Sequence, residues 1–161
     1  IPVGQFNLNQ LVTGSLVNLV LVVGAYAAGF ASAGTAAIIS PILAAFLGII
    51  PGKLPQMVPV VMMGNLVIVF ITWLCFRASN GLGKGSATVL MIVGVVAGAF
   101  LKMVTMWAAV EKIVVPVLHI NESLEKVLVG AVSISQFVTG VIGGCVALLI
   151  MPALGGLKRG R

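Results

Sequence analysis

The chain has 161 residues, of which 60% are hydrophobic and only 7% are charged, with a net charge of +6 at neutral pH. A soluble domain carries about 25% charged residues, so this composition excludes a protein whose surface faces only water. The nine cations are scattered between apolar runs and form no basic stripe, which argues against nucleic-acid binding. With a mean hydropathy of +1.24, the sequence predicts an integral membrane protein.

Five apolar runs, each close to the roughly 20 residues that span a bilayer, follow in chain order. They are continuous and do not alternate in ten-residue segments, so they indicate α-helices and not the strands of a membrane barrel. No internal repeat or second domain is visible, and residues 1–161 are predicted to form one membrane-embedded domain. The expected spans cover about residues 11–31, 34–50, 57–76, 86–110 and 124–152.

The connecting segments PGKLPQ, RASNGLGKG and EKIVVPVLHINES are rich in turn-forming residues, and their Lys and Arg content predicts the orientation. The C-terminal tail carries three cations, and RASNGLGKG, two spans earlier, carries Arg77 and Lys84. The opposite side carries Lys53, Lys112 and Lys126, the last two diluted by glutamates. We therefore expect a multi-pass membrane protein with a cytoplasmic C-terminus.

The parity of the spans raises a question about the start of the chain. Five spans with a cytoplasmic C-terminus place the first residue outside, and the chain begins with Ile1 and not with Met. We expect a preceding helix, which would give six spans with both ends cytoplasmic. A five-helix protein with a processed N-terminus is the alternative.

Strongly polar side chains interrupt four of the five spans at a similar level. At about 1.5 Å per residue, they lie roughly 10–18 Å below the expected outer ends of their helices. The four residues are Asn18, Asn65, Lys102 and Gln136. Ser15, Thr105 and Ser133 extend the same helix faces at a spacing of three residues. Polar groups that converge inside an apolar bundle predict a small-molecule site that opens to the outside.

Each polar residue also has a structural explanation. Asn and Gln in membrane helices often bond to neighbouring helices and hold a bundle together, and a lysine can extend its ammonium to the interface. The glycine pairs Gly94/Gly98 and Gly140/Gly144 fit close helix packing. His119 has no Cys or second His nearby, so no metal site is expected. The serines and threonines of the spans lack a nearby His, Asp or Glu, so an enzyme is not predicted.

Several segments resemble the substrate-binding S components of energy-coupling factor (ECF) transporters, and in particular the small bacterial type. The resemblance covers nearly the whole chain. Its specific parts are GSLVN, IPGKLPQMVPVVMMGN and the lysine of FLKMV, and the last helix contributes SQFVTGVIGG. The resemblance implies an all-α bundle of six helices, of which the first is missing from this chain. It also implies an outward-facing pocket that the first outer loop covers.

The same resemblance implies uptake of a vitamin-like or other small micronutrient, with a transmembrane scaffold subunit and two ATPase subunits as partners. The chain has no GxxxxGK[ST] phosphate loop and would depend on those partners for energy. Lys102 would bind an anionic group of the substrate. Asn18, Asn65 and Gln136 would recognise carbonyl, amide or ring-nitrogen edges of the substrate. Gln5, Asn7, Asn9 and Gln10 would form part of a polar lid. No cofactor is expected. A structural or assembly protein of the membrane, with no ligand, is the alternative.

Overall fold

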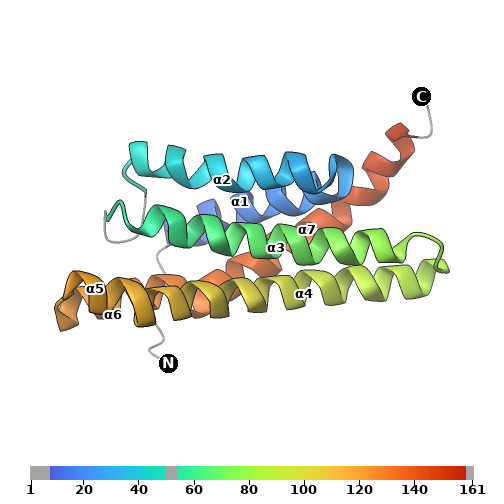
Figure 1. The fold of residues 1–161 in the computed structure, drawn as a ribbon. Helices are drawn as coiled ribbons and strands as arrows, with labels where there is room; N and C mark the ends of the chain where they lie inside the picture. Colours follow the sequence, from blue (N-terminus) through green and yellow to red (C-terminus); the bar gives the residue numbers. More distant parts are fainter. Residues whose placement is uncertain (1–7, 50–53, 159–161) are drawn as a thin grey trace.

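The computed structural model of the chain describes residues 8–49 and 54–158, and within these ranges the regular structure is entirely helical. The α-helices are α1 (Leu8–Ala27), α2 (Gly29–Phe46), α3 (Met57–Ser79), α4 (Lys84–Ala109), α5 (Val115–Leu118), α6 (Glu122–Val132) and α7 (Ile134–Lys158). A π-helical segment, η2 (Val110–Val114), joins α4 to α5. The long helices run back and forth along one direction, with α5 and α6 together at one end of the bundle (Figure 1).

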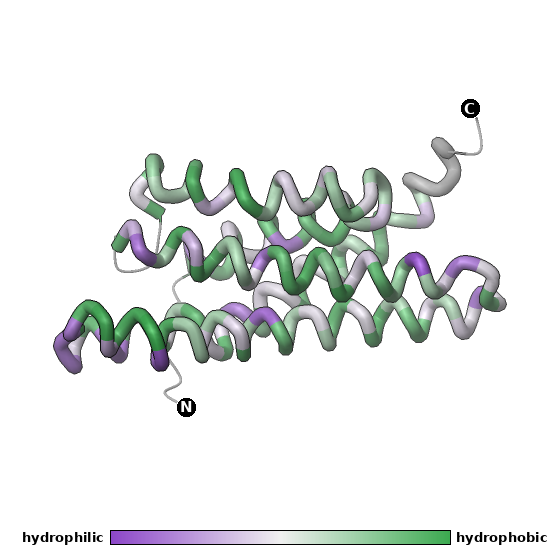
Figure 2. The backbone as a smooth tube through the Cα atoms, in the orientation of Figure 1, coloured by the Kyte–Doolittle hydropathy of each residue, from purple (hydrophilic) through white to green (hydrophobic). Residues whose placement is uncertain are grey.

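The prediction of five apolar spanning segments is confirmed. Hydrophobic residues dominate the backbone trace, and hydrophilic residues gather at the two ends and at a few places midway (Figure 2). Five helical stretches of the described chain are long and apolar enough to cross a membrane. They cover Leu8–Ala27, Gly29–Phe46, Met57–Ser79, Lys84–Leu118 and Glu122–Ala153.

The predicted boundaries of the first two spans are wrong by several residues. The turn between α1 and α2 comes at Ala28 and Gly29, before the end that was predicted at residue 31, because Gly29 adopts a left-handed φ of 85°. Helix α2 then ends at Phe46 and not at residue 50. Gly48, with a φ of 69°, stops the helix there, since glycine takes the left-handed conformation at a helix end without steric cost.

The segment EKIVVPVLHINES, predicted as a connection, is mostly helical. Helix α4 continues through η2 and α5, so Lys84–Leu118 forms one stretch of 35 residues. Pro116 lies in the first turn of α5, where a missing backbone N–H is tolerated, and the π-helical turn precedes it. The connection itself is reduced to the residues around His119, which ends α5 with a left-handed φ of 47°.

The last predicted span, 124–152, is divided into two helices. Helix α6 ends at Val132, and Ser133 adopts non-helical angles of φ −94° and ψ −120° before α7 begins at Ile134. The Ser133 hydroxyl donates to the carbonyl of Gly130 at 3.3 Å, and the Ser135 hydroxyl donates to the carbonyl of Ala131 at 2.8 Å. Serine side chains that bond nearby carbonyls compete with the helical ladder, which explains the break.

The buried apolar residues form two separate clusters. The larger one, here called the main core, is built by α1, α2, α3, α4 and α7. Its members include Leu21, Val22, Ala37, Ile68, Val69, Val95, Ala99 and Ala147. The smaller one, here called the end core, lies at the α5–α6 end of the bundle. It comprises Met57, Val60, Met106, Ala109, Val110, Val114, Leu128, Val129 and Val132.

Glycines bring the helices of the main core into close contact, as their spacing predicted. A Cβ atom on Gly140 would lie 2.7 Å from the Cβ of Ala99, and one on Gly94 would lie 2.6 Å from the Cβ of Cys75. Small residues at such crossings let helix backbones approach within a membrane, where packing contacts are a main source of association.

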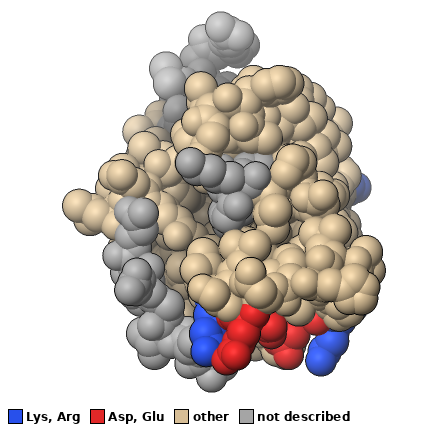
Figure 3. Space-filling model, turned by 90° about the vertical axis from the view of Figure 1, so that its left-hand side faces the viewer, with Lys and Arg blue, Asp and Glu red and all other residues tan. Residues whose placement is uncertain are grey.

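Charged residues mark the α5–α6 end. All three acidic residues of the chain, Glu111, Glu122 and Glu125, belong to η2 and α6. Viewed from this end, the acidic side chains and neighbouring cations gather along one edge of the molecule (Figure 3). Lys126 pairs with Glu122 at 2.7 Å, and Lys112 approaches Glu111 at 3.7 Å. The exposed Glu122–Lys126 pair and the exposed Lys112 indicate that this edge faces water.

Candidate functional site: a buried lysine between the two cores

Lys102 lies inside the bundle, with only 2% of its surface exposed. Its ammonium nitrogen Nζ donates hydrogen bonds to Asn18 Oδ1 at 2.7 Å and to Asn65 Oδ1 at 2.8 Å. Asn18 on α1 is fully buried and Asn65 on α3 is 1% exposed. Three of the four residues predicted to share a polar level therefore meet directly, and they connect α1, α3 and α4.

The two asparagine side chains are held in place by their own amide hydrogens. Asn18 Nδ2 donates to the carbonyl of Gly14 at 2.9 Å and to Thr139 Oγ1 on α7 at 3.4 Å. Asn65 Nδ2 donates to Ser40 Oγ on α2 at 3.4 Å and to the carbonyl of Ala37 at 3.5 Å. With both amide groups engaged in this way, both oxygens point at the lysine, and all five long helices contribute to the site.

Gly64 makes the crossing of α3 and α4 possible at this level. A Cβ atom on Gly64 would lie 2.5 Å from Cγ and Sδ of Met106 and 3.2 Å from Cγ of Lys102. The glycine therefore leaves room for the lysine stem to pass α3 and reach Asn65, the next residue. In the dipeptide Gly-Asn of MMGN, the glycine makes room for the lysine and the asparagine accepts its hydrogen bond, which the sequence alone did not reveal.

The charge of Lys102 has no acidic counterpart in the part of the chain that the structure describes. The ion pairs found there, Glu111–Lys112 and Glu122–Lys126, lie at the α5–α6 end and do not involve Lys102. An ammonium group has three donors, and the described residues supply two neutral oxygen acceptors. A buried cation with only neutral partners attracts an anion strongly, because the surrounding dielectric constant is low.

Gln136, the fourth residue of the predicted level, does not contact Lys102. Its side-chain Nε2 donates to the carbonyl of Ala131 at 3.1 Å, across the break between α6 and α7. Its own carbonyl accepts from Thr139 Oγ1 at 3.2 Å, and Thr139 in turn contacts Asn18. Gln136 is therefore linked to the lysine through Thr139. Thr139 was missed, although its spacing of three residues from Gln136 could have indicated it.

The predicted polar lid is described only in part. Gln5 and Asn7 lie outside the described residues, and Asn9 is exposed in the first turn of α1. Gln10 donates from Nε2 to the carbonyl of Ala131 at 3.0 Å, the same carbonyl that Gln136 contacts. Ser15 Oγ is buried without a hydrogen-bond partner among the described residues. The role of the N-terminal segment as a lid stays a prediction.

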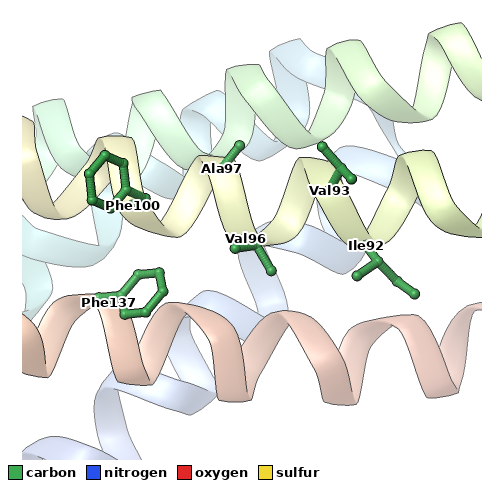
Figure 4. A pocket seen from close by; sticks show the side chains of 6 residues that line it. All are labelled: Ile92, Val93, Val96, Ala97, Phe100 and Phe137. Atoms are coloured by element: carbon green, nitrogen blue, oxygen red, sulfur yellow. The ribbon is translucent and has the colours of Figure 1, made fainter.

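A pocket of the described chain lies elsewhere. It is an apolar groove of about 440 Å³ between α4 and α7, open to the outside of the bundle (Figure 4). Its lining residues are Ile92, Val93, Val96, Ala97, Phe100 and Phe137. None of the residues hydrogen-bonded to Lys102 lines it. A groove of this composition on a spanning bundle is suited to contact with acyl chains, whereas the lysine layer is closed in this structure.

Two further residues, Trp73 and His119, lie away from the lysine. Trp73 stacks beneath the guanidinium of Arg77 at 5.5 Å and contacts Phe30, near the α3–α4 connection. This arrangement is typical of an interfacial anchor. His119 ends α5, and the described residues contain no group of three His, Cys, Asp or Glu side chains that could hold a metal ion.

Comparison with known proteins does not extend these observations, since no family model, curated protein or solved structure matches this chain.

Proposed function

We propose that the protein is the substrate-capture subunit of an importer of the ECF type, and that Lys102 binds an anionic group of its substrate. The observation that carries the proposal is a fully enclosed ammonium group whose described partners are two neutral amide oxygens. The substrate would be a vitamin-like or other small micronutrient taken up from outside. A transmembrane scaffold subunit and two ATPase subunits in the bacterial plasma membrane would complete the transporter.

The position of the resembling motifs supports this proposal. GSLVN ends at Asn18, IPGKLPQMVPVVMMGN ends at Asn65, and FLKMV contains Lys102. The three most specific segments of the resemblance therefore each contribute one member of the hydrogen-bonded group. A shared binding site gives a reason for these particular residues to meet.

The energetics of the lysine also favour a ligand. Burying a cation costs free energy that two hydrogen bonds to neutral oxygens offset only in part. An anionic substrate group would supply the missing counter-charge, and its oxygen could replace an amide oxygen that now accepts from Nζ. Asn18 and Asn65 would then be free to bond the polar edges of the substrate.

A second candidate function, a structural protein without a ligand, is favoured by one observation. The ammonium of Lys102 joins α1, α3 and α4 through two short hydrogen bonds, which is a geometry that also braces a bundle. The two candidates differ in what happens to the protein when the charge is removed.

Mass spectrometry of small molecules released from the purified protein separates these candidates. We expect an anionic compound from the unaltered protein and none from Lys102→Met, which keeps a stem of similar length without the charge. A charge-assisted hydrogen bond contributes roughly 1.5–3 kcal/mol, so affinity for the identified compound should fall on the order of 10- to 150-fold. Lys84→Met, at the exposed start of the same helix, is the matched control and should bind normally.

The outcome against the capture function is unchanged composition of the released molecules together with a clearly less stable Lys102→Met protein. That pair of results would assign Lys102 to bracing the bundle. The transporter assignment has its own test, since the chain should accumulate substrate in cells only when the scaffold and both ATPases are co-expressed. Accumulation without them would exclude the ECF type.

A further inference from the structure

The break between α6 and α7 creates a short helix with one buried and one exposed face. Leu128, Val129 and Val132 of α6 are buried in the end core, whereas Glu122 and Lys126 are exposed and paired with each other. In Figure 1, α6 lies beside α5 at one end of the bundle, while α7 continues along its length. Helix α6 is therefore a separate amphipathic segment that covers one end of the molecule.

Beneath α6, the end core leads directly to the lysine. Met106 is fully buried in the same cluster as Leu128 and Val132, and it lies one helical turn after Lys102 on α4. The Cγ and Sδ atoms of Met106 and Cγ of Lys102 crowd the same position beside Gly64. The apolar face of α6 and Met106 thus close the lysine layer from the α5–α6 end.

Two glutamine side chains hold α6 in this position. Gln10 on α1 and Gln136 on α7 both donate from Nε2 to the carbonyl of Ala131, in the last turn of α6. The break at Ser133 leaves that carbonyl without its regular helical partner, and the side chains of Gln10, Ser135 and Gln136 donate to it instead. These bonds fix the angle of α6 relative to the bundle and are polar contacts that can be exchanged.

A directed series of hydrogen bonds connects this point to Lys102. The lysine donates to Asn18, Asn18 donates to Thr139 Oγ1, and Thr139 donates to the carbonyl of Gln136. The side chain of Gln136 then donates to Ala131. If an anion replaced Asn18 as the acceptor for Lys102, the first hydrogen bond of this series would be lost. The last side chain of the series is Gln136, which holds α6.

We infer that α6 is a lid of the lysine site, that it turns about Ser133, and that Gln10 and Gln136 latch it in the closed position. The inference rests on the proposed function, because that function makes the lysine site a binding site. The test of the lid does not depend on it. Opening of α6 would separate Leu128 and Val132 from Met106 and give a small polar molecule access to Lys102 from the α5–α6 end. Discontinuous helices in membrane proteins commonly border such sites.

The test measures access to Met106 without any ligand. In a chain with Cys75→Ala and Cys145→Ala, Met106→Cys is treated with a small thiol-reactive methanethiosulfonate reagent. We expect slow reaction in that chain. With Gln10→Met and Gln136→Met added, the reaction should be on the order of tenfold faster, since two of the three side-chain hydrogen bonds to the Ala131 carbonyl are lost and only that of Ser135 remains. Methionine preserves the length of each side chain. Gln56→Met, an exposed glutamine at the start of α3, is the matched control and should leave the rate unchanged.

A second reporter distinguishes a moving lid from a generally loosened protein. Ile68→Cys in the main core should react slowly with and without the two glutamine substitutions. Amide hydrogen exchange should rise within residues 122–132 and stay constant in residues 57–79 of the same variant. Equal acceleration at both cysteines, or unchanged reaction of Met106→Cys, would overturn the lid. Neither result depends on whether Lys102 binds an anion, so the proposed function would stand or fall separately.

Discussion

The main core and the end core stabilise the same bundle by different means. In the main core, glycines on α7 bring helix backbones into direct contact, so that Gly143 faces the carbonyl of Ser15 and the N–H of Leu19. In the end core, whole side chains such as Leu128 and Met106 fill the space between helices. Polar bonds from Gln10 and Gln136 then fix the break beside it.

Because of this difference, we expect the main core to be rigid and the α6 end of the bundle to be mobile. Backbone contact between long helices leaves few alternative arrangements, because interiors packed this closely do not deform continuously. A short amphipathic helix with exposed charges is drawn from the less stable parts of a protein, which open first. Lys102 lies between the two regions, with a fixed wall on one side and α6 on the other.

The largest expected effect concerns which end faces outward. In a chain with Cys75→Ala and Cys145→Ala, Ser123→Cys should react with an impermeant thiol reagent in intact cells, and Leu82→Cys should be shielded. Both positions are exposed and lie at opposite ends of the bundle. The cations near Leu82 favour the cytoplasmic side. Labelling of Leu82→Cys alone would reverse the predicted orientation, and the α6 end would then face the cell interior.

The next largest effect tests the backbone contact in the main core. Gly143→Ala should lower the free energy of unfolding in detergent by about 3 kcal/mol, since the added methyl group meets backbone atoms that cannot rotate away. Its Cβ would lie 2.8 Å from the N of Leu19 and against the carbonyl of Ser15. Gly85→Ala, where an added Cβ would meet no atom within 4 Å outside the adjacent backbone, is the control and should unfold like the parent. Equal stability of the two variants would contradict the close contact.

A pair of cavity-forming substitutions compares the two cores directly. Ile68 and Leu128 are both fully buried, one in each core. Ile68→Ala should lower global stability by about 2 kcal/mol, near the low end for such changes, because lipid is as apolar as the core and mainly packing is lost. Leu128→Ala should instead raise amide exchange within residues 122–132 and leave global unfolding nearly unchanged. A global loss of similar size for both would mean that α6 unfolds with the main core.

Much of this fold could be predicted because a long continuous apolar run crosses a bilayer as an α-helix. The number of spanning segments and the shared level of Asn18, Asn65 and Lys102 followed from run length and helical rise. The glycine contacts followed from their spacing. These features depend on local pattern and on a constraint that acts on every residue of the span.

The parts that could not be predicted depend on single residues and tertiary contacts. The break at Ser133 occurs inside a run that is long and apolar enough to be predicted as one span, and the polar residues Ser133, Ser135 and Gln136 were not taken as a sign of it. Gln136 was placed at the level of Lys102, but the break directs its side chain to Ala131. The continuation of α4 to Leu118 was missed because Pro116 was taken as a turn former, whereas it lies in α5 directly after the π-helical turn.

The smallest expected effect probes the free end of α6. Asn121 Oδ1 accepts from the N–H of Leu124 at 2.9 Å and thereby caps the helix. Asn121→Ala removes this bond and should cost about 1 kcal/mol of local stability. Because the cap lies in the segment proposed to open, the loss should appear as roughly fivefold faster amide exchange within residues 122–132. Asn80→Ala is the control, since Asn80 is an exposed asparagine at the opposite end, where it follows α3 and caps no helix with its side chain. Faster exchange in α7 as well as α6 would show that the cap stabilises both helices as one unit, and that Ser133 does not separate them.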